Sequence, residues 1–333
     1  MFHITIVESI HPEAVKLIED HDNFSYELIE NIDEKNLLQK IENADAVALR
    51  TADLTDKIIK NSKKLKIVSR HGVGYDNVDL KSLNGNNIAL TITIHANAVT
   101  VAEHVLAMMF YLNKKIHVFD GSVRKNQFDK FKFKKNEIIT LNTELFEKSI
   151  LIIGFGRIGK ELAKRCHAFG MNIIIYDPYV RNDRLIDILN VRKIEKLSEA
   201  LSLADYVSIH MPLNEETKNL IDKDKLEKMK KNSIIINTSR GGIVNERDLN
   251  LILEKGTIAG AGLDVFEDEP PSSKNPLLQN SKVVLTPHSA ALTKECWKRM
   301  GIETVQNIFN FFNGDISNKV IVNKDSIHYK YNK

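Results

Sequence analysis

Short apolar runs recur along the chain and alternate with longer segments whose apolar residues stand at helical spacing. The runs have the length of buried strands and cover residues 4–7, 46–49, 66–69, 150–154, 172–177, 206–210, 233–237 and 282–286. Helical patterns lie between them, among others at 11–21, 77–86 and 156–170. This alternation predicts an α/β fold in which parallel sheets are flanked by helices.

Two helical patterns shape the expected domain organisation. The pattern at 97–116 is the longest and is apolar on most of its circumference, so we expect it to lie between domains or in a subunit interface. The last pattern ends at the pair Asn313-Gly314, a normal helix stop, and we expect it to pack on the first domain. A chain of 333 residues exceeds what one hydrophobic core usually serves. We therefore expect one domain of residues 1–98 and 293–333, and a second of residues 99–292.

Composition narrows the class of protein. A hydrophobic content of 43% and a charged content of 27% are those of an ordinary soluble globular protein, and a net charge of +3 does not argue for a nucleic-acid partner. The lysine-rich segment 125–135 is typical of solvated surface. Cys166 and Cys296 lie far apart without the spacing of metal ligands, which suits a reducing compartment. We therefore expect no metal site. The N-terminus does not have the pattern of a signal peptide and no apolar stretch has the length of a membrane span, so we expect a cytoplasmic protein.

The segment ILIIGFGRIG carries the pattern of a dinucleotide-binding turn. Gly154, Gly156 and Gly159 follow a predicted strand and open a predicted helix. In this context the glycines permit a tight turn, a close approach of the backbone to a pyrophosphate, and close packing of helix on strand. The first amides of the helix then favour an anion, and we expect Arg157 and Ile158 to lie against the cofactor phosphates.

Asp177 ends the next predicted strand, 18 residues after Gly159 (177 minus 159). An acidic residue at about this distance binds the adenosine ribose and repels a 2′-phosphate, which favours NAD over NADP as the cofactor. Asp177 could instead be a turn residue before Pro178, with Arg181 and Arg184 available for a phosphate.

Three polar residues follow the predicted strands beyond this turn: Arg240, Glu269 and His288. Ligands of an open parallel sheet bind outside the carboxyl ends of its strands. A base, an acid and a cation beside a nicotinamide are what the oxidation of an alcohol needs. His288 would exchange the hydroxyl proton, Glu269 would orient the imidazole and stabilise its protonated form, and Arg240 would polarise the carbonyl and hold a carboxylate. Taken alone, Glu269 could belong to a solvated acidic loop and His288 could be a capped surface histidine. Their joint placement with Arg240 favours a catalytic role.

Seven segments of the chain occur in a family-specific order: RHGVGYDNVDL (70–80), NAVTVAEHVLAMM (97–109), GFGRIG (154–159), YDP (176–178), NTSRGGIVNERDL (237–249), AGLDVFEDEPP (261–271) and LTPHSAALT (285–293). With them the chain closely resembles the D-isomer-specific 2-hydroxyacid dehydrogenases over nearly its whole length. The resemblance implies two Rossmann-like domains with an active-site cleft between them. Both chain ends would form the substrate-binding domain, the central part would bind NAD, and the protein would be a homodimer.

The same motif positions imply roles for individual residues. Arg240, Glu269 and His288 would be the catalytic set. Asp264, Thr238 and Thr93 would lie near the cofactor. The loop around Val73 and Gly74 would give backbone amides to the substrate carboxylate.

The substrate is less well defined by the sequence. Arg50 and Arg70 follow predicted strands of the first domain, and these loops, together with Asn97, resemble the phosphoglycerate dehydrogenase branch. Extra cations would suit a 3-phosphoglycerate-like substrate with a second anionic group. The alternatives are that Arg50 or Arg70 pairs with a carboxylate inside the first domain, and that the protein is a hydroxypyruvate or glyoxylate reductase.

Two features depart from the family pattern. Ile94 and His95 stand where many relatives have a proline-containing turn, which leaves the shape of this loop open. The chain ends shortly after the last predicted helix, so we expect no regulatory C-terminal domain. A function of another class also stays open, because the family includes NAD-sensing corepressors that keep the fold and the catalytic residues.

Overall fold

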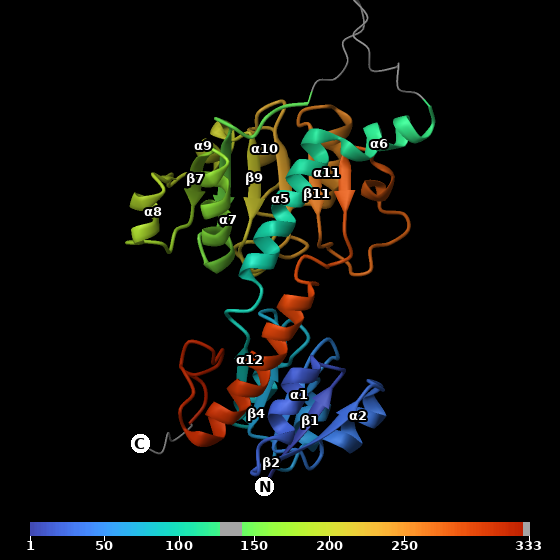
Figure 1. Cartoon of the computed structure of the whole chain (residues 1–333), viewed down its shortest axis with the longest axis vertical. Coiled ribbons are helices and arrows are strands. Elements are labelled where there is room, and N and C mark those ends of the chain that lie inside the picture. The colour runs from blue at the N-terminus through green and yellow to red at the C-terminus, as the bar shows by residue number, and fades with distance from the viewer. Residues whose placement is uncertain (127–141, 329–333) are drawn as a thin grey trace, which may run out of the picture. The chain divides into compact units, whose positions relative to one another are not determined.

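The computed structural model describes residues 1–126 and 142–328 of the chain. They form two compact units, shown in Figure 1: unit 1 comprises Met1–Asn97 and Leu292–Lys333, and unit 2 comprises Ala98–Ala291. Most of the lysine-rich segment that we predict to be solvated surface lies outside the described residues. Each unit contains a parallel sheet of its own.

Unit 1 is built on a five-stranded sheet with the order β2-β1-β3-β4-β5, in which all paired strands are parallel. Its strands are β1 (Phe2–Val7), β2 (Phe24–Ile29), β3 (Ala46–Leu49), β4 (Ile67–Arg70) and β5 (Ala89–Ile92). Its helices are α1 (Pro12–Glu19), α2 (Glu34–Ile41), α3 (Asp56–Asn61), α4 (Leu80–Gly85) and α12 (Lys294–Asn313).

Successive side chains of a strand point to opposite faces of a sheet, and unit 1 buries both faces. On one face, Ile4 and Ile6 pack with residues of α1 and α12. On the other face, Val47 and Val68 pack with residues of α2, α3 and α4. The continuous apolar runs of the sequence are therefore strands covered by helices on both sides.

Unit 2 is built on a seven-stranded parallel sheet with the order β12-β11-β10-β9-β6-β7-β8. Its strands are β6 (Ser149–Ile153), β7 (Asn172–Tyr176), β8 (Arg192–Lys193), β9 (Tyr206–Ile209), β10 (Ile234–Asn237), β11 (Gly260–Leu263) and β12 (Val283–Leu285). Its helices are α5 (Ala98–Lys114), α6 (Ile116–Arg124), α7 (Arg157–Ala168), α8 (Arg184–Ile188), α9 (Leu197–Leu203), α10 (Lys223–Leu226), α11 (Glu246–Glu254) and the 3-10 helix η2 (Pro276–Gln279).

The order of these strands reverses at β6, because the chain moves to β7 and β8 on one side and to β9 through β12 on the other. Ligands of such sheets bind at this switch point, outside the carboxyl ends of the strands. Helices α5 and α7 cover one face of the sheet, and α9, α10 and α11 cover the other. The predicted α/β fold with parallel sheets flanked by helices is confirmed.

The two long helical patterns of the sequence are both helices in the structure. The last helix ends at Asn313, with Gly314 at a φ of 80°, and it packs in the core of unit 1 as expected. The long apolar helix is α5, and most of its apolar side chains are buried within unit 2 against the sheet and α7. Helix α6, which follows α5, was not predicted from the sequence. Among the described residues, no helix is long and apolar enough to cross a lipid bilayer.

Candidate active site

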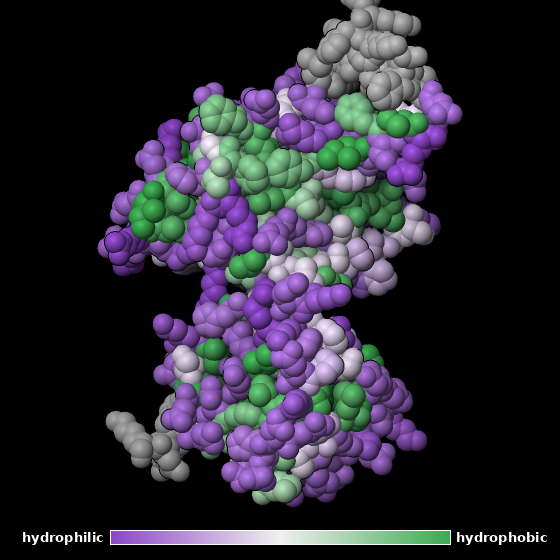
Figure 2. All heavy atoms as spheres, in the orientation of Figure 1, coloured by the Kyte–Doolittle hydropathy of each residue, from purple (hydrophilic) through white to green (hydrophobic). Residues whose placement is uncertain are grey.

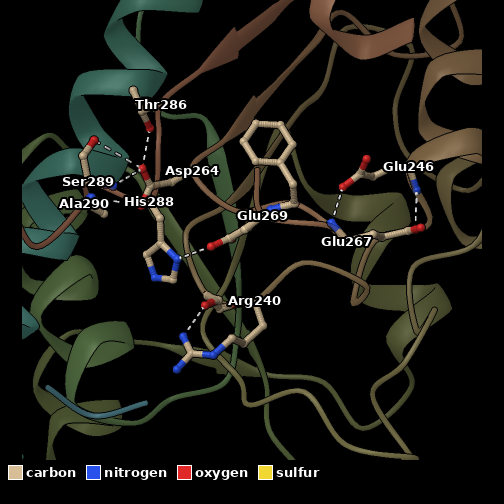
Figure 3. Close-up of polar contacts among 11 residues, drawn as sticks. Arg240, Glu246, Asp264, Glu267, Glu269, Thr286, His288, Ser289 and Ala290 are labelled. Carbon is tan, nitrogen blue, oxygen red and sulfur yellow. Dashed lines mark hydrogen bonds and ion pairs between the residues drawn. The ribbon is translucent and has the colours of Figure 1, made fainter. Parts of the chain in front are cut away.

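Three neighbouring strands of unit 2 end at the same edge of the sheet. Asn237 of β10 pairs with Leu263 of β11, and Leu263 pairs with Leu285 of β12. The segments that follow these strands carry Arg240, Glu269 and His288, whose side chains gather in Figure 3. Strand register thus brings together three residues that are 48 positions apart at most (288 minus 240).

His288 and Glu269 form a direct pair. The distance between His288 Nδ1 and Glu269 Oε2 is 2.7 Å, and the side chains are 52% and 38% exposed, so a small molecule can reach them. The other carboxylate oxygen, Oε1, accepts a hydrogen bond of 3.1 Å from the backbone N–H of Phe266. His288 has a φ of 50°, and its backbone N–H donates to Asp264 O at 2.8 Å. The contact engages Nδ1 of the imidazole, which leaves Nε2 to exchange a proton with a ligand.

Arg240 lies beside this pair in Figure 3. Its guanidinium Nη1 donates to Ser239 O at 2.6 Å, and its own carbonyl oxygen accepts from Asn237 Nδ2 at 2.8 Å. Asn237 is buried and also accepts from the backbone N–H of Ser239 at 3.0 Å. The last residue of β10 therefore fixes the turn that presents the guanidinium.

Asp264 is fully buried and its carboxylate is engaged by the turn that carries His288. It accepts hydrogen bonds from Thr286 Oγ1 at 2.5 Å and from the backbone N–H groups of Ser289 and Ala290 at 2.8 and 2.9 Å. His104 of α5 reaches the same network through a 3.1 Å contact with Thr286 Oγ1. The sequence predicts Asp264 near the nicotinamide, and its hydrogen bonds also support the turn that carries His288. His104 could not be predicted from the sequence, because nothing local links a helix to Thr286.

The glycine-rich turn after β6 has the geometry that a dinucleotide requires. Gly154 has a φ of 94°, and a Cβ there would lie 2.5 Å from His210 O, so only glycine fits. A Cβ on Gly159 would lie 2.3 Å from Gly154 O, which reflects close packing of α7 on the strand. Gly156, by contrast, has open space around it and directly precedes Arg157 and Ile158 in the first turn of α7. The exposed backbone there can approach a pyrophosphate.

Asp177 follows β7 and is tied to this turn. Its Oδ2 accepts from the backbone N–H of Phe155 at 2.7 Å, and its Oδ1 accepts from Tyr179 and Val180 at 2.8 and 3.1 Å. A carboxylate has about four acceptor positions, so these three bonds leave capacity for a ribose hydroxyl. The acidic group thus lies beside the turn, as the dinucleotide fingerprint requires.

Two buried polar atoms near the strand ends of unit 2 have no hydrogen-bond partner among the described residues. They are Thr238 Oγ1, after β10, and His210 Nδ1, after β9. Buried polar atoms are seldom left unpaired, so a bound cofactor is a suitable partner at this edge. Burial lowers the pKa of His210 to about 3, so its ring is neutral at ordinary pH.

The remaining predicted residues lie in unit 1. Arg70 donates through Nε to Asn77 Oδ1 at 3.2 Å and through Nη1 to His71 O at 2.8 Å, and Arg50 Nη1 lies 3.4 Å from Ser9 O. Burial, and then the positive charges of Arg50 and Arg70, lower the pKa of His71 to about 4. The positive charges of the two guanidinium groups therefore both influence the imidazole of His71.

The other predicted unit 1 residues lie on the loop after β4 and on the segment after β5. Val73 and Gly74 are partly exposed on the segment between β4 and α4, and Thr93 N donates to Gly72 O at 3.0 Å. Thr93 is buried and its Oγ1 has no partner among the described residues. Asn97 directly precedes α5 and is partly exposed.

The fold and the site define a class of domain first. A parallel sheet with a glycine-rich turn at its switch point and an acidic residue after the next strand is a dinucleotide-binding domain of the Rossmann type. Residues 106–290 match the model of the family "D-isomer specific 2-hydroxyacid dehydrogenase, NAD binding domain". The chain belongs to the D-isomer specific 2-hydroxyacid dehydrogenase family, and this segment is its NAD-binding domain.

Named relatives agree with this family. The chain is 34% identical over 322 residues to D-3-phosphoglycerate dehydrogenase of Methanocaldococcus jannaschii, covering 96% of this chain and 59% of that protein. It is 35% identical over 284 residues to glyoxylate reductase of Korarchaeum cryptofilum, covering 85% of this chain and 84% of that protein. The solved structure of D-lactate dehydrogenase from Aquifex aeolicus, complexed with NAD and lactic acid, is similar with a TM-score of 0.82 at 28% identity, covering 96% of this chain and 98% of that one. The chain spans less than two thirds of the length of the phosphoglycerate dehydrogenases that it resembles.

Proposed function

We propose that this protein is an NAD-dependent D-2-hydroxyacid dehydrogenase, which transfers hydride reversibly between NAD(H) and a small 2-hydroxy or 2-keto acid. The observation that carries the proposal is the 2.7 Å contact between His288 Nδ1 and Glu269 Oε2. This pair stands at the same sheet edge as the dinucleotide-binding turn, with Arg240 beside it.

In this proposal His288 is the acid and base. In the direction of reduction, protonated Nε2 donates a proton to the oxygen of the substrate carbonyl, and in the direction of oxidation neutral Nε2 accepts the hydroxyl proton. Glu269, bound to Nδ1, holds the ring in the orientation that leaves Nε2 available and stabilises the imidazolium through its negative charge.

Arg240 would bind the reacting end of the substrate. A guanidinium presents several N–H donors in a planar fork, which matches the geometry of a carboxylate and can also polarise a neighbouring carbonyl. The turn held by Asn237 presents this fork beside His288. Val73 and Gly74 are proposed to add backbone amides for the carboxylate.

The residues that would hold the cofactor are the glycine-rich turn from Gly154 to Gly159, with Arg157 and Ile158, and Asp177 for the adenosine ribose. Thr238, Thr93 and Asp264 are proposed to lie near its nicotinamide end. When bound, the nicotinamide accepts or supplies the hydride of the reaction. Asp177 favours NAD over NADP, because its carboxylate would repel a 2′-phosphate.

For the substrate we propose an acid with a second anionic group, similar to 3-phosphoglycerate. The support is the cluster of Arg50, Arg70 and His71 in unit 1, where two positive charges act on one buried histidine whose Nε2 has no partner among the described residues. Asn97 is proposed to contribute to the same subsite. The names of the relatives include a phosphoglycerate dehydrogenase and a glyoxylate reductase, so a substrate without the second anion is the alternative.

The test is NADH oxidation with a panel of 2-keto acids that includes phosphohydroxypyruvate, hydroxypyruvate, glyoxylate and pyruvate. We expect turnover of 2-keto acids, with the highest kcat/KM for the acid that carries a second anion. Arg50→Gln and Arg70→Gln should raise KM for that acid more than for glyoxylate. Arg192→Gln, which changes an arginine side chain that is 63% exposed, serves as the matched control. Binding of NADH without turnover of any acid would instead favour an NAD-sensing binding protein.

A further inference from the structure

The loop that carries Glu269 is closed at both ends by one carboxylate, that of Glu246 at the start of α11. Glu246 Oε1 accepts from the backbone N–H of Glu267 at 2.6 Å, and Glu246 Oε2 accepts from Asn275 Nδ2 at 2.5 Å. The backbone N–H of Glu246 donates in return to Glu267 Oε1 at 3.2 Å, and Figure 3 shows this reciprocal pair beside Glu269. The segment 267–275 is therefore hydrogen-bonded to the same side chain at both of its ends.

The start of α11 is also joined to the segment that carries Arg240. A Cβ on Gly241 would lie 1.7 Å from Phe266 O and 2.6 Å from Glu267 N, so the backbones of the two segments are in direct contact there. Glu246 lies only five positions further along the chain than Gly241 (246 minus 241). One compact arrangement thus holds the turn of Arg240, the first turn of α11 and the loop of Glu269.

An acidic residue in the first turn of a helix is common and usually interacts with the amides of its own helix. In α11 a different side chain binds a helix amide: Asn245 Oδ1 accepts from Asp248 N at 3.0 Å. Both oxygens of Glu246 accept instead from donors of the 267–275 loop. Burial, with the negative charges of Glu267 and Asp268 nearby, raises the pKa of Glu246, so the carboxylate is held at an energetic cost that these hydrogen bonds offset only in part.

We propose that Glu246 is a positioning residue, which fixes the 267–275 loop so that Glu269 meets His288 in the geometry required for proton transfer. This inference rests on the proposed function of the His288 and Glu269 pair. It assigns Glu246 no contact with substrate or cofactor.

The test compares Glu246→Ala with Glu246→Gln, which keeps an oxygen for the Glu267 amide. In Glu246→Ala we expect kcat to fall by roughly tenfold to a hundredfold, the range for the loss of a supporting hydrogen bond or a displacement of about 1 Å, with the Kd for NADH unchanged. Glu246→Gln should recover much of the loss. Glu254→Ala removes a carboxylate from the other end of α11, where it accepts from Asn250 Nδ2 at 2.9 Å, and should leave kcat unchanged.

A double-mutant comparison separates positioning from general destabilisation. If Glu246 acts through Glu269, Glu246→Ala should lower kcat little further in a Glu269→Gln background. An equal loss of kcat in both backgrounds, or wild-type kcat in Glu246→Ala, would overturn the inference and leave the proposed function intact. A wild-type protein that reduces no 2-keto acid would defeat the proposed function, and the positioning role with it.

Discussion

At the scale of single residues, the side chain of Glu269 contacts both the backbone of its own loop and the imidazole of His288. One of its oxygens accepts from the Phe266 amide, and the other lies 2.7 Å from His288 Nδ1. The carboxylate is therefore oriented before a substrate arrives, and it selects which imidazole nitrogen faces a ligand. Such preorganisation is what a proton-transfer site requires.

Replacing Glu269 by Gln tests this electrostatic role. The amide keeps an oxygen but removes the negative charge beside the imidazole. We expect kcat for reduction of a 2-keto acid to fall in Glu269→Gln, by less than removal of His288 causes. Wild-type kcat in Glu269→Gln would contradict the assigned roles.

Asp177 sets the expected cofactor preference. Its carboxylate lies at the glycine-rich turn, where it accepts from the Phe155 amide at 2.7 Å. The wild-type protein should have a much higher kcat/KM with NADH than with NADPH, and Asp177→Ala should narrow that difference, mainly by relieving repulsion of the 2′-phosphate. Equal kcat/KM values of the wild type for the two cofactors would refute the assignment.

Some candidate site residues could be predicted from the sequence, because their position along the chain already encodes their place in the fold. Arg240, Glu269 and His288 follow neighbouring parallel strands, so their convergence at one edge could be predicted from strand order. The hydrogen bonds of Asp264 and Glu246 could not be predicted, because each depends on how a loop turns back toward another element. Contacts of this kind leave no periodic signal in the sequence.

At the scale of secondary-structure elements, strand β11 is not among the apolar runs of the sequence, and its composition explains why. Strand β11 reads GAGL and lacks the branched side chains typical of strands. A Cβ on Gly262 would lie 3.0 Å from Met108 Sδ of α5, and one on Gly260 would lie 2.9 Å from Lys282 O. The glycines of β11 thus permit close packing, and because of them the strand does not appear as an apolar run in the sequence.

Helix α5 was expected to be shared with a neighbour because of its apolar circumference, and its burial within unit 2 removes most of that reason. An apolar surface nevertheless lies at its C-terminal end. We define this apolar surface as Phe110, Tyr111, Ile116, Phe146 and Phe169. All of these residues except Phe110 are more than a third exposed. Figure 2 shows apolar side chains gathered over this part of α5, α6 and α7.

Exposed apolar groups of this extent favour association, so we predict a homodimer through the apolar surface. Sedimentation velocity at micromolar concentration should give twice the monomer mass, and Phe146→Lys combined with Phe169→Lys should give the monomer mass. Leu28→Lys, which changes an exposed apolar residue of unit 1, should leave the dimer intact. A monomeric wild-type protein would refute this prediction.

At the scale of the whole molecule, each unit contains a buried histidine that is neutral in the folded state. Burial, together with Arg50 and Arg70, lowers the pKa of His71 in unit 1 to about 4, and burial lowers the pKa of His210 in unit 2 to about 3. Both values lie below the ordinary value of 6.5, so below that pH the unfolded chain binds more protons than the folded one. Stability is therefore complete above pH 6.5 and falls as the pH drops toward these values.

The predicted size of this effect is about 2 kcal/mol for each histidine between pH 7 and pH 5, from about 1.4 kcal/mol per pH unit below 6.5. Urea unfolding at the two pH values should show the loss in the free energy of unfolding. His210→Gln should reduce the difference between pH 7 and pH 5, because its share of the proton uptake is removed. A wild-type protein that is equally stable at both values would contradict the assignment of neutral buried histidines.

The central claim is that His288 exchanges the proton while the rest of unit 2 binds the cofactor, and one comparison of variants measures it most directly. The measurement is kcat for NADH-dependent reduction of the best 2-keto acid, together with the Kd for NADH, in the wild type, His288→Ala and His167→Ala, an exposed histidine of α7. We predict that His288→Ala lowers kcat by roughly a hundredfold to ten-thousandfold with an unchanged Kd, while His167→Ala behaves as the wild type. Near wild-type kcat in His288→Ala would contradict the proposed mechanism.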